Sequence, residues 1–178
     1  YGDGAGAVVL GATESEEPTG ILAHSSRSDT IAHSKMLSMG PSYAPEHEEE
    51  ADIFLKMNGR KLYQYALETV PAAVKACLEK SRISLDRIAK FLFHQANGKM
   101  DSAILERLFS LYGKEESPEG IMPMIVPWAG NSSVASLPTL LDLILRGRME
   151  GQQIEKGDPL VLASVGAGMN INAMIYKT

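Results

Sequence analysis

A short apolar stretch that ends in polar residues constrains this chain more than any other feature. Residues 88–93 are apolar except for Lys90, a pattern typical of a buried strand, and His94 follows directly. A helical pattern then begins, with apolar side chains spaced three or four residues apart from Met100 to Leu111. We therefore expect His94 at the carboxyl end of a strand and beside the start of a helix. In open α/β sheets, ligands bind in the crevice at this position.

The histidine fits two interpretations. An imidazole can donate a hydrogen bond near neutral pH, so His94 can serve a binding or catalytic site. Histidine is also often partly buried in proteins, and an imidazole bonded to a backbone carbonyl would have only a structural role. The position of His94 in the pattern leaves both interpretations open.

The composition predicts one ordinary globular domain, residues 1–178. Of the 178 residues, 44% are hydrophobic and 22% are charged, and the net charge is −5. The mild acidity argues against nucleic acid as the main partner, and no apolar run reaches the roughly 20 residues that span a bilayer. The single cysteine excludes an internal disulfide. With no signal peptide or tail anchor in the sequence, we expect a cytoplasmic protein that does not bind membranes.

The first residues indicate an excised domain or fragment. Residues 1–4 begin without an initiator methionine and lead directly into an apolar run, so we expect a partner half outside this sequence. The glycines satisfy a loose GxGxxA pattern, but a dinucleotide site needs a strand before that pattern and a helix after it. A tight glycine turn into a strand over about residues 5–14 fits better. Residues 20–25 are its predicted hairpin partner.

The middle of the chain predicts a loop and then a long helix. Residues 25–52 are polar and irregular, which is typical of a functional or mobile loop. The spacing of His24, His33 and His47 fits no metal motif, so we expect no metal site. A helical pattern over residues 57–80 contains Pro71, where we expect a kink or a break. Cys77 lies on the apolar face of this helix and is interpreted as an inert core residue.

The second half of the chain alternates between helical and strand patterns. Strands or extended segments are predicted over residues 121–126, 159–165 and 172–176, and helices over residues 98–112 and 134–146. A turn is predicted before the last helix, with Asn131 or Ser132 as its N-cap. This order predicts an α/β fold, a mixed sheet covered by helices and closed by a hairpin.

Three polar loops have the composition of a site that stabilises negative charge, at residues 94–97, 130–133 and 166–168. Histidine and asparagine side chains can donate hydrogen bonds to one carbonyl oxygen, and a glycine-rich turn can present backbone N–H groups to another. No nucleophile completes the set, since residues 130–133 do not form a GxSxG elbow. On local sequence alone, Asn131 equally fits a helix cap, and the glycines fit a plain turn.

Five segments, taken in order, resemble one family. They are residues 1–7, 57–60, 94–97, 130–136 and 166–168, which read YGDGAGA, MNGR, HQAN, GNSSVAS and GAG. In this order and at this spacing, the chain resembles the C-terminal half of a β-ketoacyl-acyl-carrier-protein synthase III. The resemblance implies a thiolase-like half, which stacks with a second half as five α-β-α-β-α layers.

The resemblance also implies a reaction, a decarboxylative condensation in fatty acid or related biosynthesis. A cysteine in the N-terminal half would take an acyl group from acyl-coenzyme A. Malonyl-acyl carrier protein would then lose carbon dioxide, and its enolate would attack the acyl-cysteine. His94 and Asn131 match the family's pair that stabilises this enolate. The turn formed by Gly166, Ala167 and Gly168 would supply an oxyanion hole, mainly through the Ala167 amide.

The remaining matched positions concern binding and assembly. Gly59 and Arg60 fall where the family approaches its pantetheine channel. Asn97 would position the pantetheine arm or a water, and Lys99 would face the acidic carrier protein. The resemblance implies no cofactor besides the acyl-coenzyme A substrate. It implies that the complete protein is a homodimer in which this chain packs against its own N-terminal half.

The chain departs from the family pattern near the expected site. Residues 166–172 replace a longer glycine run followed by an aromatic residue, and residues 127–129 are atypical, which leaves the acyl primer open. The nucleophilic cysteine is absent, so the isolated chain is expected to be inactive. Two other classes fit: a non-catalytic thiolase-fold subunit that binds acyl chains or a partner, and an enzyme that forms esters or amides. Retention of both His94 and Asn131 favours carbon–carbon bond formation.

We predict that this half, produced alone, folds weakly or not at all as a monomer. One face of its sheet or helix layer should be covered by the other half, and exposing that apolar face to water is unfavourable. Urea unfolding of the dilute chain, followed by circular dichroism, measures this. A cooperative unfolding transition of a monomer at low concentration would contradict the expectation.

Overall fold

The fold is organised around a four-stranded mixed sheet. The computed structural model describes residues 1–44 and 52–178. The strand order is β1-β6-β5-β4, where β4 and β5 run parallel and β6 is antiparallel to both β5 and β1. The bounds are β1 (Gly20–Ser28), β4 (Lys90–Phe93), β5 (Pro159–Gly166) and β6 (Asn170–Lys177). The predicted mixed sheet with a closing hairpin is confirmed.

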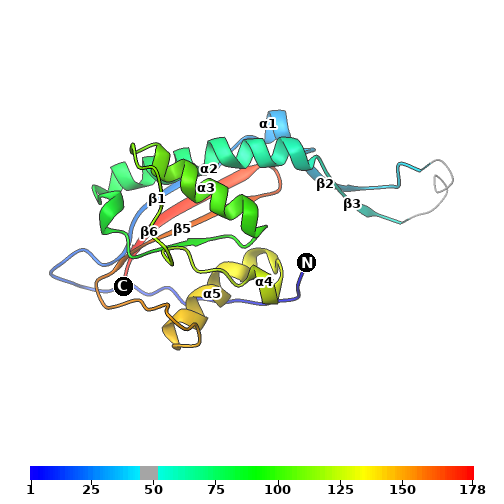
Figure 1. Cartoon of the computed structure of the whole chain (residues 1–178). Helices are drawn as coiled ribbons and strands as arrows, with labels where there is room; N and C mark the ends of the chain where they lie inside the picture. Colours follow the sequence, from blue (N-terminus) through cyan, green and yellow to red (C-terminus); the bar gives the residue numbers. More distant parts are fainter. Residues whose placement is uncertain (45–51) are drawn as a thin grey trace.

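Helices cover both faces of this sheet (Figure 1). On one face lie α2 (Gly59–Ser81) and α3 (Gly98–Ser110), and on the other lies α5 (Ser136–Leu145). Because both faces are covered, β5 is apolar on both sides. Its Val161 faces the core beneath α2 and α3, whereas Leu160 packs into the core beneath α5. The smaller elements are α1 (Thr30–His33), β2 (Leu37–Gly40), β3 (Phe54–Met57), η2 (Leu85–Arg87), α4 (Val126–Ala129) and η3 (Ser133–Ala135).

The N-terminal hairpin predicted from sequence is wrong. Residues 5–14 contain no strand, and residues 20–28 pair with β6, from Gly20 opposite Lys177 to Ser28 opposite Asn170. The first residues instead run along the side of the molecule that carries α4 and α5 (Figure 1). The apolar pattern of residues 5–14 is real, but no strand in the described part of the chain pairs with it. Val9 is 99% exposed as a result.

The described part of the predicted polar loop, residues 25–44 and 52, includes regular secondary structure. It contains the end of β1, α1 and β2, and β2 pairs antiparallel with β3 to form a hairpin that projects from the body (Figure 1). His47 lies outside the described residues. Among the described residues, no group of three histidine, cysteine, aspartate or glutamate side chains is arranged to hold a metal ion. In that same part of the chain, no helix has the length and apolarity to cross a membrane.

α2 is a single helix, so the break that Pro71 predicts does not occur. Asn58 caps its start, with Oδ1 accepting a hydrogen bond from the Lys61 N–H at 3.3 Å. Buried residues on both sides of Pro71 pack against the sheet, and this burial outweighs the hydrogen bond that proline cannot donate. Cys77 is fully buried, as predicted, and burial raises the pKa of its thiol.

The other boundaries agree with the sequence within a few residues. α3 and the two closing strands form as predicted, and the predicted helix over residues 134–146 begins with η3 and continues as α5. The predicted turn over residues 127–133 contains most of α4, and residues 121–125 form neither a helix nor a strand. These differences fall in short segments, where apolar spacing carries little information.

Asp101 is a buried carboxyl group in the first turn of α3. Asp101 is 2% exposed, and its Oδ2 has no hydrogen-bond partner among the described residues. Burial raises the pKa of this carboxyl from 3.8 to about 7, against a smaller lowering by a backbone hydrogen bond with Asn97. Asp101 therefore carries its proton in the folded protein at mildly acidic pH.

We predict that Asp101→Asn stabilises the protein in alkaline solution. The stabilising contribution of protonated Asp101 is full below the unfolded pKa of 3.8 and is lost as the pH rises through about 7. Asparagine stays neutral, so the free energy of unfolding should exceed that of wild type by about 1–3 kcal/mol at pH 8 and by little at pH 4. Urea unfolding of the complete protein at both pH values measures this. Asp86→Asn, at a carboxylate that is 65% exposed, is the matched control. An equal gain at both pH values would contradict the explanation.

Candidate functional site

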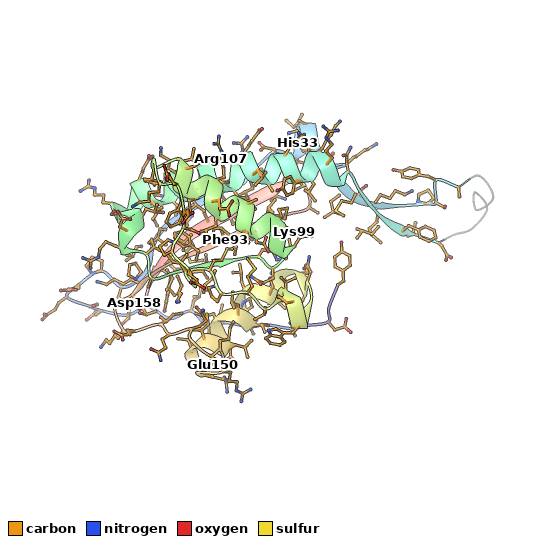
Figure 2. All side chains as sticks on the ribbon, viewed as in Figure 1. His33, Phe93, Lys99, Arg107, Glu150 and Asp158 are labelled. Atoms are coloured by element: carbon orange, nitrogen blue, oxygen red, sulfur yellow. The ribbon has the colours of Figure 1, made fainter. Side chains whose placement is uncertain are left out.

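The candidate site lies at the carboxyl ends of β4 and β5, which end at the same edge because the strands are parallel. His94 directly follows β4, and its N–H donates to the Ala163 carbonyl at 2.9 Å. Phe93 pairs with Ala163, so the turn after Gly166 lies farther along β5, by about 10 Å at a rise of about 3.3 Å per residue. Figure 2 labels Phe93 at the end of β4 and Lys99 in the first turn of α3.

The His94 imidazole is held from the side by the start of α5. Its Nδ1 lies 2.9 Å from the hydroxyl oxygen of Ser136, a fully buried residue. The same oxygen accepts a hydrogen bond from the Gln95 N–H at 3.3 Å. Burial lowers the pKa of His94, and a backbone hydrogen bond with Ser133 offsets part of this. The imidazole is therefore neutral at pH 7, with one nitrogen able to donate and the other to accept.

Asn131 lies in the short segment between α4 and η3. Its Oδ1 accepts a hydrogen bond from the Ser133 N–H at 2.8 Å, two residues later, which makes an Asx turn. Ser132, one of the two predicted N-cap residues, is at the N-cap position of η3, but its side chain makes no capping hydrogen bond. The segment 131–136 contributes Asn131 and both contacts to the His94 ring. Asn131 is therefore bonded to Ser133, a residue whose backbone contacts the His94 ring.

The turn that joins β5 to β6 is exposed at Ala167, whereas Met169, two residues later, is held in place. Among the described residues, the Ala167 N–H has no hydrogen-bond acceptor. Met169 is 1% exposed, and its carbonyl accepts a hydrogen bond from the Asp29 N–H at 2.9 Å. Gly166 and Gly168 flank the free N–H, and Gly168 adopts a φ of +135°, which side chains disfavour. The turn can therefore present a backbone donor on a fixed support.

The four predicted binding residues lie at two helix starts. Gly59 and Arg60 are the first residues of α2, and both are exposed. Asn97 caps α3, with Oδ1 accepting from the Lys99 N–H at 3.0 Å, so only its Nδ2 remains for another partner. Lys99 is exposed at the start of α3 (Figure 2). Within the described residues, no hydrogen bond or ion pair joins these four residues to His94 or Asn131.

Gln95 is an important residue of the site that the sequence analysis missed. It is fully buried, and its Nε2 donates to the Phe93 carbonyl at 3.0 Å. Its Oε1 accepts from the N–H groups of Ile125 and Val126 at 2.9 and 3.2 Å. These groups lie at the start of the segment that leads to Asn131. A polar residue in a strand-to-helix loop was a visible signal, but two of its three partners, Ile125 and Val126, lie 30 and 31 residues away in the chain.

Comparisons with known proteins agree on one family. The model of the family described as 3-oxoacyl-[acyl-carrier-protein] synthase III, C terminal, matches residues 78–178. The β-ketoacyl-[acyl-carrier-protein] synthase III of Latilactobacillus sakei is 30% identical over 182 residues, which cover 99% of this chain and 52% of that protein. The corresponding protein of Lactobacillus delbrueckii subsp. bulgaricus is 33% identical over 181 residues, with 99% and 52% covered. The chain spans about half the length of the curated relatives it matches.

Solved structures share the fold. The 3-oxoacyl-(acyl carrier protein) synthase III of Pseudomonas aeruginosa PAO1 superimposes with a TM-score of 0.73 at 21% identity, over 93% of this chain and 46% of that one. The synthase III of Thermus thermophilus gives a TM-score of 0.71 at 26% identity, over 93% and 48%. The priming β-ketosynthase of the R1128 polyketide pathway gives 0.72 at 25% identity, over 92% and 46%. The predicted thiolase-like α/β fold is thereby confirmed.

We predict that Gln95→Met destabilises the folded protein by about 2–4 kcal/mol, because it leaves buried backbone groups of Phe93, Ile125 and Val126 without partners. Methionine keeps the volume and the apolar stem. The midpoint of urea unfolding, at an unchanged slope, measures the loss. Gln64→Met, the same change at an exposed position of α2, is the control and should alter stability by less than about 0.5 kcal/mol. Equal midpoints for the two variants would exclude the anchoring role of Gln95.

Proposed function

Because this chain belongs to the 3-oxoacyl-[acyl-carrier-protein] synthase III family as its C-terminal domain, we propose that it supplies one half of a condensing active site. The complete protein would join an acyl group from acyl-coenzyme A to the enolate left when malonyl-acyl carrier protein loses carbon dioxide. The observation that carries this proposal is the segment 131–136, which positions Asn131 and contacts the His94 ring at the end of β4.

His94 and Asn131 would stabilise the enolate. Loss of carbon dioxide places negative charge on the thioester oxygen, and two N–H donors aimed at that oxygen lower the barrier. In the tautomer in which the Ser136 hydroxyl accepts from the Gln95 N–H and donates to Nδ1 of His94, the ring proton resides on Nε2 and would be the one offered to the thioester oxygen. The Oδ1 of Asn131 is already engaged, which leaves Nδ2 as the free donor. The lowered pKa of His94 keeps the ring neutral for this task.

The Ala167 N–H would contribute to the oxyanion hole for the acyl thioester. The free N–H and the anchored turn support this role. The nucleophile would be a cysteine of the N-terminal half, since Cys77 is fully buried and burial raises the pKa of its thiol. The isolated chain is therefore expected to perform neither acylation nor condensation.

Exposed apolar side chains support packing against an N-terminal half. One group of them lies in the first residues and around α4, η3 and α5, on one side of the molecule. An exposed apolar surface of this kind is typical of an interface. This group includes Val8, Val9, Leu10, Trp128, Val134 and Leu145, each at least 61% exposed, whereas other exposed apolar side chains, such as Ile31 on α1 and Met39 on β2, lie elsewhere. The complete protein is also proposed to form a homodimer and to act in the cytoplasm.

The starts of α2 and α3 would bind the thioester substrates. Gly59, Arg60 and Asn97 would line the pantetheine channel, and their exposure at two helix starts is compatible with this. The exposed Lys99 would contact the acidic carrier protein. A subunit that only bound acyl chains would have no need for paired donors such as His94 and Asn131, so condensation accounts better for these residues.

We predict that His94→Ala in the complete protein reduces carbon dioxide release from malonyl-carrier protein by about 10²–10³-fold, the effect of losing one such donor. Acylation of the cysteine should continue, because the nucleophile lies in the other half. Radiolabelled acyl-coenzyme A measures label on the protein, and labelled malonyl-carrier protein measures carbon dioxide release.

His24→Ala is the matched control, because this histidine is exposed on β1. It should leave both readings unchanged. Equal collapse of acylation and decarboxylation in folded His94→Ala would refute the role given to His94. If the wild-type protein, offered a broad panel of thioesters, gave neither label nor carbon dioxide, the non-catalytic subunit would replace the condensing enzyme.

A further inference from the structure

The loop that joins β5 to β6 contains an unassigned contact from Asn170. Gly166 and Asn170 face each other as the last residue pair of the two strands, so the loop consists of Ala167, Gly168 and Met169. The Nδ2 of Asn170 donates a hydrogen bond to the Ala167 carbonyl at 3.0 Å. The side chain at the base of the loop therefore folds back over the loop and engages the residue whose N–H is free.

Gly168 makes room for this contact. A side-chain carbon built on Gly168 would lie 2.2 Å from the Nδ2 of Asn170, which no real contact tolerates. The φ of +135° at Gly168 likewise disfavours any other residue. Glycine at position 168 and asparagine at position 170 thus fit each other. They lie in the segment, residues 166–172, that departs from the family pattern.

Without Asn170, the same glycine would leave two orientations open to the peptide between Ala167 and Gly168. Glycine accepts positive and negative φ about equally, so the peptide between Ala167 and Gly168 can flip at little cost. In the flipped orientation, the Ala167 carbonyl oxygen would point away from Asn170 and would lose its hydrogen bond to Nδ2. The Ala167 N–H belongs to the preceding peptide, between Gly166 and Ala167, so this flip does not by itself turn it. Strand pairing at Gly166 restrains the Ala167 backbone on one side, and the Asn170 contact to the Ala167 carbonyl restrains it on the other.

The other contacts of the loop do not hold the Ala167 carbonyl; only the Asn170 side chain does so among the described residues. The Asp29 N–H holds the Met169 carbonyl, and the Met169 side chain is buried, so the far end of the loop is fixed. Neither contact reaches the Ala167 carbonyl. Asn172, two residues along β6, has its Oδ1 engaged by the Ser26 hydroxyl at 2.8 Å and makes no hydrogen bond to the loop in the described structure.

We propose that Asn170 is a positioning residue for the oxyanion hole: by holding the Ala167 carbonyl, it restrains the backbone of Ala167 and so the position of the residue whose N–H would face the thioester oxygen. This inference rests on the proposed function. Asn170 touches no reacting atom in this scheme. It selects one orientation of the loop, and it acts on the step in which the cysteine takes up the acyl group.

Asn170→Asp in the complete protein tests the proposal. Aspartate has the shape of asparagine, but its carboxylate cannot donate to the Ala167 carbonyl and repels it. Loss of an oxyanion donor costs about 10²–10³-fold in rate, so partial misorientation should lower kcat for acylation by about tenfold or more. The KM for acyl-coenzyme A should change little, and carbon dioxide release from malonyl-carrier protein should be retained. Asn172→Asp is the matched control, since its carboxylate can still accept from Ser26.

The outcomes separate this inference from the function on which it rests. A wild-type protein that neither acylates nor decarboxylates overturns the proposed function and the inference with it. With an active wild type, normal acylation by Asn170→Asp would show that asparagine only fills space and would overturn the inference alone. Equal loss of acylation and decarboxylation in the folded variant would overturn it as well. If Asn170→Asp does not fold, Asn170→Ala carries the same comparison, with a loss confined to acylation as the supporting result.

Discussion

The fully buried amide of Gln95 holds together the parts of the chain that form the site. It ties the end of β4 to the backbone of Ile125 and Val126, where α4 begins. Buried N–H groups without partners are costly, so the loop that follows β4 and the segment that leads to Asn131 must keep a fixed relation. Ser136 adds a second link by contacting both the His94 ring and the Gln95 N–H. The position of His94 relative to Asn131 depends on these two buried polar side chains.

A second set of contacts supports the loop after β5 from the opposite side. Asp29 accepts hydrogen bonds from Arg27 at 2.6 Å and from the Tyr65 hydroxyl at 2.8 Å, while its own N–H holds the Met169 carbonyl. The Arg27 hydrogen bond, followed by that of Tyr65, lowers the pKa of Asp29, so the carboxylate stays charged. Burial, followed by the bond to Asp29, raises the pKa of Tyr65 to about 12. The loop is thereby connected to the first third of α2, through Tyr65.

The hydrophobic cores on the two faces of the sheet differ in size. The core beneath α2 and α3 is extensive and closed, with Phe91 stacked edge-on against both Phe93 and Phe109. The side that carries α4 and α5 has a smaller core, and Trp128 and Val134 next to the site are exposed. A site at such an edge is bounded by this chain on one side only. The proposed donors His94 and Asn131 lie at this edge, whereas the chain's one cysteine, Cys77, is buried in the core beneath α2 and α3, which is the arrangement expected if a second half supplies the nucleophilic cysteine.

The sequence by itself determined the strand before His94, the long helices and the closing hairpin, because apolar spacing reports directly which faces are buried. The ordered motifs also indicated the family and the residues of the candidate site. Only the tertiary structure decided which strands pair: residues 20–28 joined β6, and residues 5–14 found no strand beside them. It also decided the roles of Gln95, Ser136 and Asn170. Their partners are backbone or side-chain groups brought together by the folded chain, and hydrogen-bond geometry of this kind leaves no periodic trace in a sequence.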